Sequence, residues 1–204
     1  MFKEPIINVY IPYEPEYRLG AAYNRIMQES AHEWNLLLDH DVILLNPQWY
    51  NMCQQAILYL ERESKPAGII TAMTNAFPLN FPNGYLPQIS YRSPKTTDIA
   101  HHKQWADYLY NRYNGIIREV CWPLAFGGCF MLTNKTAWAT SGGFADEYQC
   151  DFDYCDRLHR NGFKQYILPG LYIYHATDGR INERERKIDR EKRRIEGKLL
   201  ADLQ

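Results

Sequence analysis

Three features are scarce in this chain of 204 residues, and each scarcity excludes a class of protein. No apolar run approaches the roughly 20 residues that cross a bilayer, so the sequence predicts no transmembrane helix. The first residues lack the basic and then apolar layout of a secretory signal, and we therefore expect a cytoplasmic protein. Cysteines number five, without a CxxC pair, which favours reduced thiols over a disulfide framework or a zinc site.

Excess charge is also small. The chain has 23 basic and 24 acidic residues, which excludes a uniformly basic nucleic-acid binder. Residues 180–204 nevertheless hold nine basic and six acidic side chains, with apolar Ile181, Ile188 and Ile195 seven residues apart. We expect a domain over 1–178 and a charged helical tail over 179–204. The tail would pack on the body, join subunits of a homo-oligomer, or present a basic face to a polyanion.

What the chain does contain is enough apolar surface for a core, with 46% hydrophobic and 14% aromatic residues. Apolar runs and amphipathic segments alternate along it, which predicts an α/β fold with a mostly parallel central sheet flanked by helices. Strands are expected over 6–11, 34–38, 67–74, 125–132, 163–167 and 171–174. Helices are expected over 19–33, 47–63, 97–113, 134–140 and 151–161, and a long proline-rich loop over 75–94.

An acidic pair follows the expected strand 34–38. Asp39 and Asp41 stand one residue apart, where open α/β sheets bind ligands. Two close carboxylates are costly unless a cation neutralises them, and hard divalent cations bind carboxylate and phosphate oxygens together. The pair therefore suits Mg²⁺ or Mn²⁺ bridging a diphosphate, although surface turns with two acids are also common.

Later polar residues add to this pair. Asp151 and Asp153 open an expected helix, and His175 ends the last expected strand. Together with the acidic pair they supply the parts of a metal–diphosphate site and a general base.

The order and spacing of several motifs resemble those of family 2 glycosyltransferases. The matching segments are Ala22-Tyr23-Asn24, Trp34 to Asp41, Pro47-Gln48-Trp49, Gly127-Gly128, Gly142-Gly143-Phe144, Asp151-Phe152-Asp153, Arg157, Gly162 and His175. The resemblance covers about residues 6–178 and points to short enzymes of bacteria and phages. It implies a GT-A fold and an inverting enzyme that moves a sugar from a nucleotide-diphosphate sugar to an acceptor hydroxyl.

The resemblance also implies roles for individual residues. Asp39, Asp41 and His175 would bind Mn²⁺ or Mg²⁺, and Asp151 would be the catalytic base, with Asp153 as its rival. The donor would be contacted by Pro12, Tyr13, Arg18, Asn24, Asp39, His40, Gly128 and Arg157.

Alternatives remain for the acceptor and for the class of protein. The acceptor is expected to be a saccharide, a lipid-linked group or a protein, or else a hydroxymethylated DNA base as in phage enzymes. A nucleotidyltransferase shares the α/β layout and a two-carboxylate metal site. A non-catalytic sugar- or nucleotide-binding protein is the remaining alternative.

Overall fold

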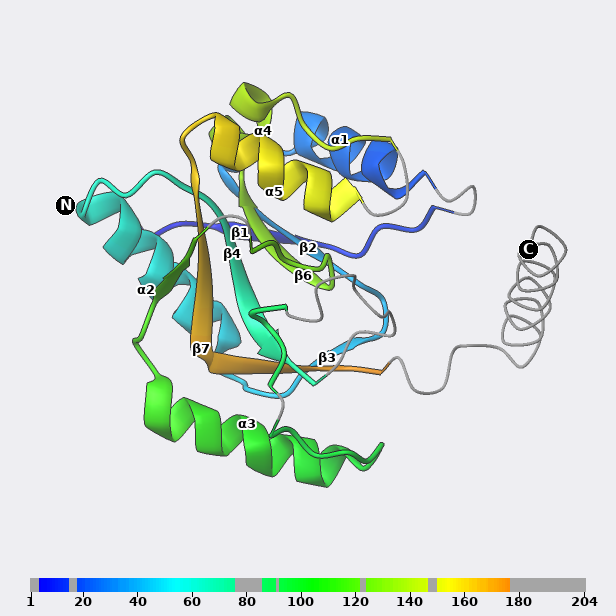
Figure 1. Ribbon diagram of the computed structural model, residues 1–204, viewed down its shortest axis with the longest axis vertical. Coiled ribbons are helices and arrows are strands. Elements are labelled where there is room, and N and C mark those ends of the chain that lie inside the picture. Colours follow the sequence, from blue (N-terminus) through cyan, green and yellow to red (C-terminus); the bar gives the residue numbers. More distant parts are fainter. Residues whose placement is uncertain are drawn as a thin grey trace, which may run out of the picture.

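A single sheet organises the molecule. The computed structural model describes residues 4–14, 18–75, 86–90, 92–121, 124–146 and 150–176. Its strands run in the order β1-β2-β6-β4-β7-β3, and β5 pairs with β7 (Figure 1). The strands are β1 (Ile7–Tyr10), β2 (Trp34–Leu38), β3 (Val42–Leu44), β4 (Ala67–Thr74), β5 (Arg118–Val120), β6 (Phe130–Asn134) and β7 (Lys164–His175). The helices are α1 (Leu19–Glu29), α2 (Trp49–Arg62), α3 (Ile99–Tyr113), α4 (Lys135–Ser141) and α5 (Cys150–Arg160).

Helices cover both faces of this sheet. Side chains of a strand alternate between faces, so Leu36 packs in the cluster that contains α2, whereas Leu37 packs with α1, α4 and α5. The latter three helices lie together on one side in Figure 1. Helix α3 packs on the second half of β7, where Leu109 joins a cluster with Tyr172 and Tyr174. The predicted α/β class is therefore confirmed as a layered helix–sheet–helix arrangement.

The prediction of a mostly parallel sheet is wrong, because the sheet is mixed. Strands β1 and β2 are parallel, as are β4 and β7, but β6 lies antiparallel between β2 and β4. Strands β3 and β5 are antiparallel to β7. A strand buried on both faces reads as a continuous apolar run in either direction, so the sequence of β6 carries no sign of its orientation.

Some element boundaries also differ from the expected ones. The last two expected strands are one strand, β7, and its pairing with β4 shifts register between Ala72 and Met73 instead of breaking. Strands β3 and β5, of three residues each, were not expected. The expected strand over 125–132 begins only at Phe130. The predicted tail over 179–204, most of the loop over 75–94 and the boundary at 178 lie outside the described residues.

Candidate functional site

Three strand ends bring the candidate site together. Strand β2 ends at Leu38, and the backbone N–H of Asp39 then donates to the Cys129 carbonyl at 3.2 Å. After a tight turn, β3 pairs with the end of β7 so that Val42 lies opposite His175. The N–H of Ala176 donates to the Asp41 carbonyl at 2.9 Å, which extends this pairing by one step. The turn and the ladder thus place Asp39, Asp41 and His175 beside one another.

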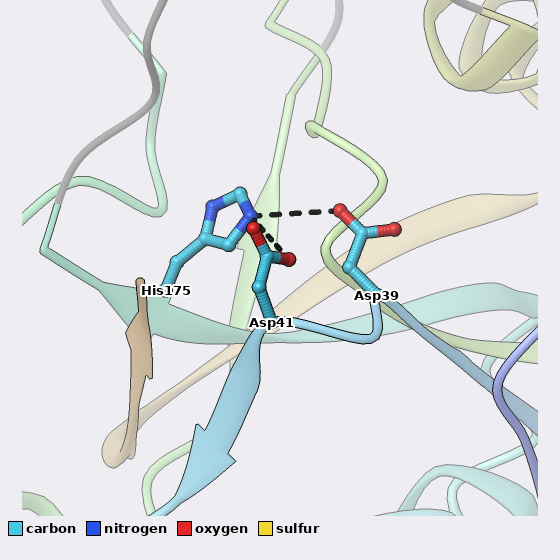
Figure 2. Close-up of side chains that lie close together, drawn as sticks. All are labelled: Asp39, Asp41 and His175. Carbon is cyan, nitrogen blue, oxygen red and sulfur yellow. Dashed lines mark ion pairs between the residues drawn. The ribbon is translucent and has the colours of Figure 1, made fainter. Parts of the chain in front are cut away.

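We call Asp39, Asp41 and His175 the triad. Their side chains point toward each other (Figure 2). The His175 Nε2 atom lies 3.2 Å from Asp41 Oδ1 and 3.6 Å from Asp39 Oδ2. Only 7% of the His175 side chain and 11% of the Asp41 side chain are exposed, compared with 31% for Asp39. The triad is therefore open to solvent mainly on the Asp39 side.

The donor set of the triad fits a divalent cation. One ligand atom from each residue can be chosen so that all three lie within 4.8 Å of one another. Two carboxylates and an imidazole are ligands that Mn²⁺ accepts, and a cation removes the repulsion between two close carboxylates.

Asn75, directly after β4, fixes the position of His175. Its side-chain amide donates to the His175 carbonyl at 3.1 Å and accepts from the His175 N–H at 2.8 Å. Asn75 is buried, so both bonds are shielded from water. The backbone that carries the imidazole is thus held on one side by β3 and on the other by Asn75.

Asp151, in the first turn of α5, lies next to the loop before β6 that contains Gly127 and Gly128, here called the glycine loop. A Cβ added to Gly128 would lie 3.5 Å from Asp151 Oδ2, so the loop backbone approaches the carboxyl group closely. Burial raises the pKa of Asp151 from its ordinary value of 3.8 to about 6. The N–H groups of Phe152 and Gly128 partly offset this effect, and the charge of Asp39 adds to it. Gly128 is followed by Cys129, whose carbonyl accepts the Asp39 N–H, so the same loop contacts both Asp151 and the triad.

Asp153 has a different environment from Asp151, although they share a helix. Its Oδ2 atom lies 2.7 Å from Nε of Arg157, one turn later, and 43% of its side chain is exposed. Arg157 also donates to the Gly142 carbonyl at 3.3 Å. Asp153, the rival base expected from the sequence, is therefore ion-paired with an arginine. Among the described residues, no basic side chain forms an ion pair with Asp151.

Gln88 holds the glycine loop in place. Its side chain accepts from the Gly127 N–H at 2.7 Å and donates to the Gly127 carbonyl at 3.2 Å and to the Thr71 hydroxyl at 2.6 Å. Gln88 is fully buried. It therefore ties the loop that faces Asp151 to the middle of β4.

The side chain of Asn24, an expected donor contact, is occupied by hydrogen bonds within the fold. Its Oδ1 atom accepts from the Phe144 N–H and from Trp138 Nε1, and its Nδ2 donates to the Phe144 carbonyl, all at 2.9 Å. The turn that it holds needs glycine at 143, because φ is +72° there and a Cβ would lie 2.6 Å from Asn24 Oδ1. Asn24 thus connects α1 to the turn after α4.

The remaining expected donor contacts are more exposed. Arg18 pairs with Asp146 at 2.9 Å, and both side chains are more than half exposed. Tyr13 is 84% exposed, Pro12 is partly buried beside it, and His40 is exposed at the turn between the two aspartates.

Two residues of the site were not expected from the sequence. Asn75 follows an expected strand directly, so its place at a strand end was a usable signal. Gln88 gave no such signal, because it stands in a proline-rich loop and its partners lie 17 and 39 residues away.

Comparisons with known proteins do not name this site. No family model matches the chain, and no curated protein matches it significantly. Among the described residues, no helix has the length and apolar character needed to traverse a bilayer.

Proposed function

We propose that the protein is a metal-dependent, inverting glycosyltransferase that uses a nucleotide-diphosphate sugar. The observation that carries the proposal is the meeting of Asp39, Asp41 and His175 beside the loop of Gly127 and Gly128, which Asp151 also approaches. The layered α/β arrangement, with Asp39 and Asp41 between β2 and β3 and His175 at the end of β7, supports the GT-A fold expected from the resemblance.

In this proposal the triad binds the diphosphate end of the donor through Mn²⁺ or Mg²⁺. The bound cation would neutralise negative charge on the diphosphate as it leaves. Asp39, the more exposed carboxylate, lies on the open side of the triad, where a nucleotide would enter. Asp41 and His175 are nearly buried and are held by backbone pairing, so they provide the rigid part of the site.

Asp151 is the base in this proposal. Its carboxylate accepts the proton of the acceptor hydroxyl while that oxygen attacks the anomeric carbon and the bond from this carbon to the diphosphate oxygen breaks. Attack on the face opposite the leaving group inverts the anomeric configuration. A pKa of about 6 suits this step, because the group is ionised at neutral pH and remains basic enough to take a proton.

A panel of nucleotide-diphosphate sugars tests the proposal without knowledge of the acceptor. With Mn²⁺, at least one donor should be hydrolysed slowly to the nucleoside diphosphate and free sugar. Asp41→Ala should abolish this reaction, whereas the control Asp107→Ala, which removes a surface carboxylate of α3, should not. Full activity in excess EDTA would overturn the metal role.

The identity of the products separates the proposal from its rival class. Release of a nucleoside diphosphate supports a glycosyltransferase. Conversion of a nucleoside triphosphate and a sugar phosphate with release of pyrophosphate would instead assign a nucleotidyltransferase. Binding of nucleotide sugars without turnover, for any acceptor including hydroxymethylated DNA, would favour a non-catalytic binding protein.

A further inference from the structure

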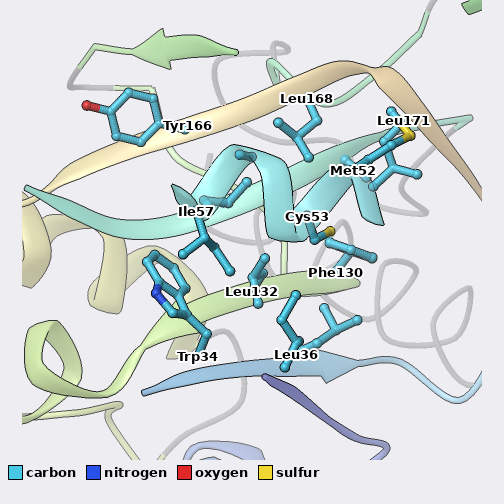
Figure 3. Packing of buried hydrophobic residues seen from close by; sticks show 14 of the residues in the cluster. Trp34, Leu36, Met52, Cys53, Ile57, Phe130, Leu132, Tyr166, Leu168 and Leu171 are labelled. Carbon is cyan, nitrogen blue, oxygen red and sulfur yellow. The ribbon is translucent and has the colours of Figure 1, made fainter. Parts of the chain in front are cut away.

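A pocket of about 310 Å³ lies between α2, the end of α3 and β7, away from the triad. Its floor is apolar and includes Met52 of α2 and Leu168 of β7, which Figure 3 shows on the helix and on the strand that it covers. Leu168 and His175 are seven positions apart along β7, and the pocket and the triad share no residue. The volume is at the lower end of the roughly 300–1,000 Å³ of small-molecule sites.

The rim of the pocket is polar but uncharged. Amide side chains of Asn51, Gln55 and Asn114 stand at its edge, and all three residues are exposed. Each amide offers both donors and an acceptor, which is the pattern that vicinal hydroxyl groups require. None of the lining residues that the structure describes carries a formal charge at neutral pH. A phosphate or carboxylate would therefore find no compensating cation among these lining residues.

Two tyrosines complete the lining. Tyr59 of α2 and Tyr110 of α3 offer aromatic surface with a hydroxyl at its end, which suits a ligand with both C–H faces and hydroxyl groups. Combined with the amides, this surface matches a neutral sugar ring. We propose that the pocket binds one or two units of a neutral saccharide, and that, if the proposed function holds, it anchors an acceptor chain whose reacting end lies at the triad.

A proline-rich peptide is the rival ligand for a tyrosine-lined surface, and the contacts disfavour it. Such peptides lie across parallel, exposed aromatic side chains. Here the guanidinium of Arg62 stands over the Tyr59 ring, 5.8 Å from its centroid. Tyr110 is partly buried and packs against the core cluster of α2. Only Tyr59 is exposed, so the pocket lacks the second exposed ring that such a peptide needs, while both tyrosines still line it.

Binding is tested by NMR titration of the full-length protein with maltose, cellobiose, lactose and a proline decapeptide. At least one disaccharide should shift the side-chain amide resonances of Asn51 and Gln55. The double substitution Asn51→Ala/Gln55→Ala should weaken that binding about tenfold or more, because two exposed amides lose their hydrogen bonds. The control Gln28→Ala/Gln104→Ala removes two exposed helical amides elsewhere and should leave binding unchanged.

The titration also separates this inference from the proposed function. Asp41→Ala should abolish donor hydrolysis but keep disaccharide binding. If the wild-type protein binds a disaccharide but hydrolyses no donor, the saccharide site is supported and only its role in holding an acceptor loses its basis. The inference is overturned if no disaccharide shifts the lining resonances, if binding survives the Asn51/Gln55 double substitution, or if only the proline peptide binds.

Discussion

The side-chain amide of Asn75 holds both backbone polar groups of His175, although 100 residues separate the two in sequence. The strand pair of β4 and β7 makes this possible, because the two strands run parallel and end at the same edge of the sheet. A metal ligand whose backbone is fixed in this way does not have to be ordered when the cation binds. Ordering costs are therefore met during folding rather than during binding.

Replacing Asn75 by alanine should weaken Mn²⁺ binding by about 10–100-fold, the range typical of residues that orient metal ligands. Isothermal titration calorimetry at pH 7.5 measures the effect. The matched control is Asn35→Ala, because Asn35 is also buried and its side chain makes two hydrogen bonds, with Ser30 and His32, against the three that Asn75 makes. Similar loss of stability in both variants with unchanged Mn²⁺ affinity in Asn75→Ala would show that Asn75 only supports the fold.

Binding of a cation to the triad should stabilise the folded state. At an Mn²⁺ concentration of 100 times Kd, the free energy of unfolding should rise by about 2.7 kcal/mol. Differential scanning calorimetry should show a higher Tm with Mn²⁺ than with EDTA. The increase should disappear in Asp41→Ala and persist in Asp107→Ala. Equal increases in both variants would place the cation elsewhere.

Asn24 offers a test between a role in donor binding and a role in the fold. Asn24→Ala removes three hydrogen bonds to Trp138 and Phe144 and should lower the free energy of unfolding by about 2–4 kcal/mol. Urea unfolding measures this, with Asn161→Ala as a control that loses one exposed bond. Unchanged stability together with a higher KM for the nucleotide sugar would instead assign Asn24 to the donor site.

The sequence was sufficient for elements whose signal is local. Strands 34–38 and 67–74 were predicted with the bounds that the structure has, because each is a short apolar run between polar breaks. The three residues of the triad were also predicted, since each stands at the end of such a run. That they lie together required the pattern of the family that the chain resembles, because spacing alone does not fix which strand ends are neighbours.

Long-range pairing explains what could not be predicted. Strand β3 has only three residues, and it is a strand because Val42 to Leu44 pair with the end of β7, more than 100 residues later. The orientation of β6 is set in the same way by its two neighbours. Gln88 acquires its role from Gly127 and Thr71, and neither partner is recognisable from the loop sequence around it.

The rate of transfer should rise with pH through about 6. Asp151 accepts a proton in the proposed reaction, so only its ionised form is active, and burial raises its pKa to about 6. The measurement is kcat/KM for the donor between pH 4.5 and 8 at saturating Mn²⁺. Asp153→Asn should keep this limb of the profile. If Asp153→Asn abolishes the limb and Asp151→Asn retains activity, the base is Asp153.

Asp151→Asn should make the protein more stable while it stops transfer. Below pH 3.8 the carboxyl group is protonated in both the folded and the unfolded chain, so it adds no pH dependence there. Between 3.8 and about 6 the unfolded chain loses the proton first, and the wild-type protein therefore loses stability as pH rises. Above pH 6 this cost reaches at most about 3 kcal/mol, which asparagine avoids.

Urea unfolding in EDTA should give equal stabilities for the wild type and Asp151→Asn near pH 3.5 and a more stable variant at pH 8. Asp153→Asn, which loses an exposed pair with Arg157, should change stability by at most about 1 kcal/mol without this rise. A variant of Asp151 that is no more stable than the wild type at pH 8 would mean that the carboxylate is not held at an energetic cost, and Asp151 would lose its physical distinction from Asp153.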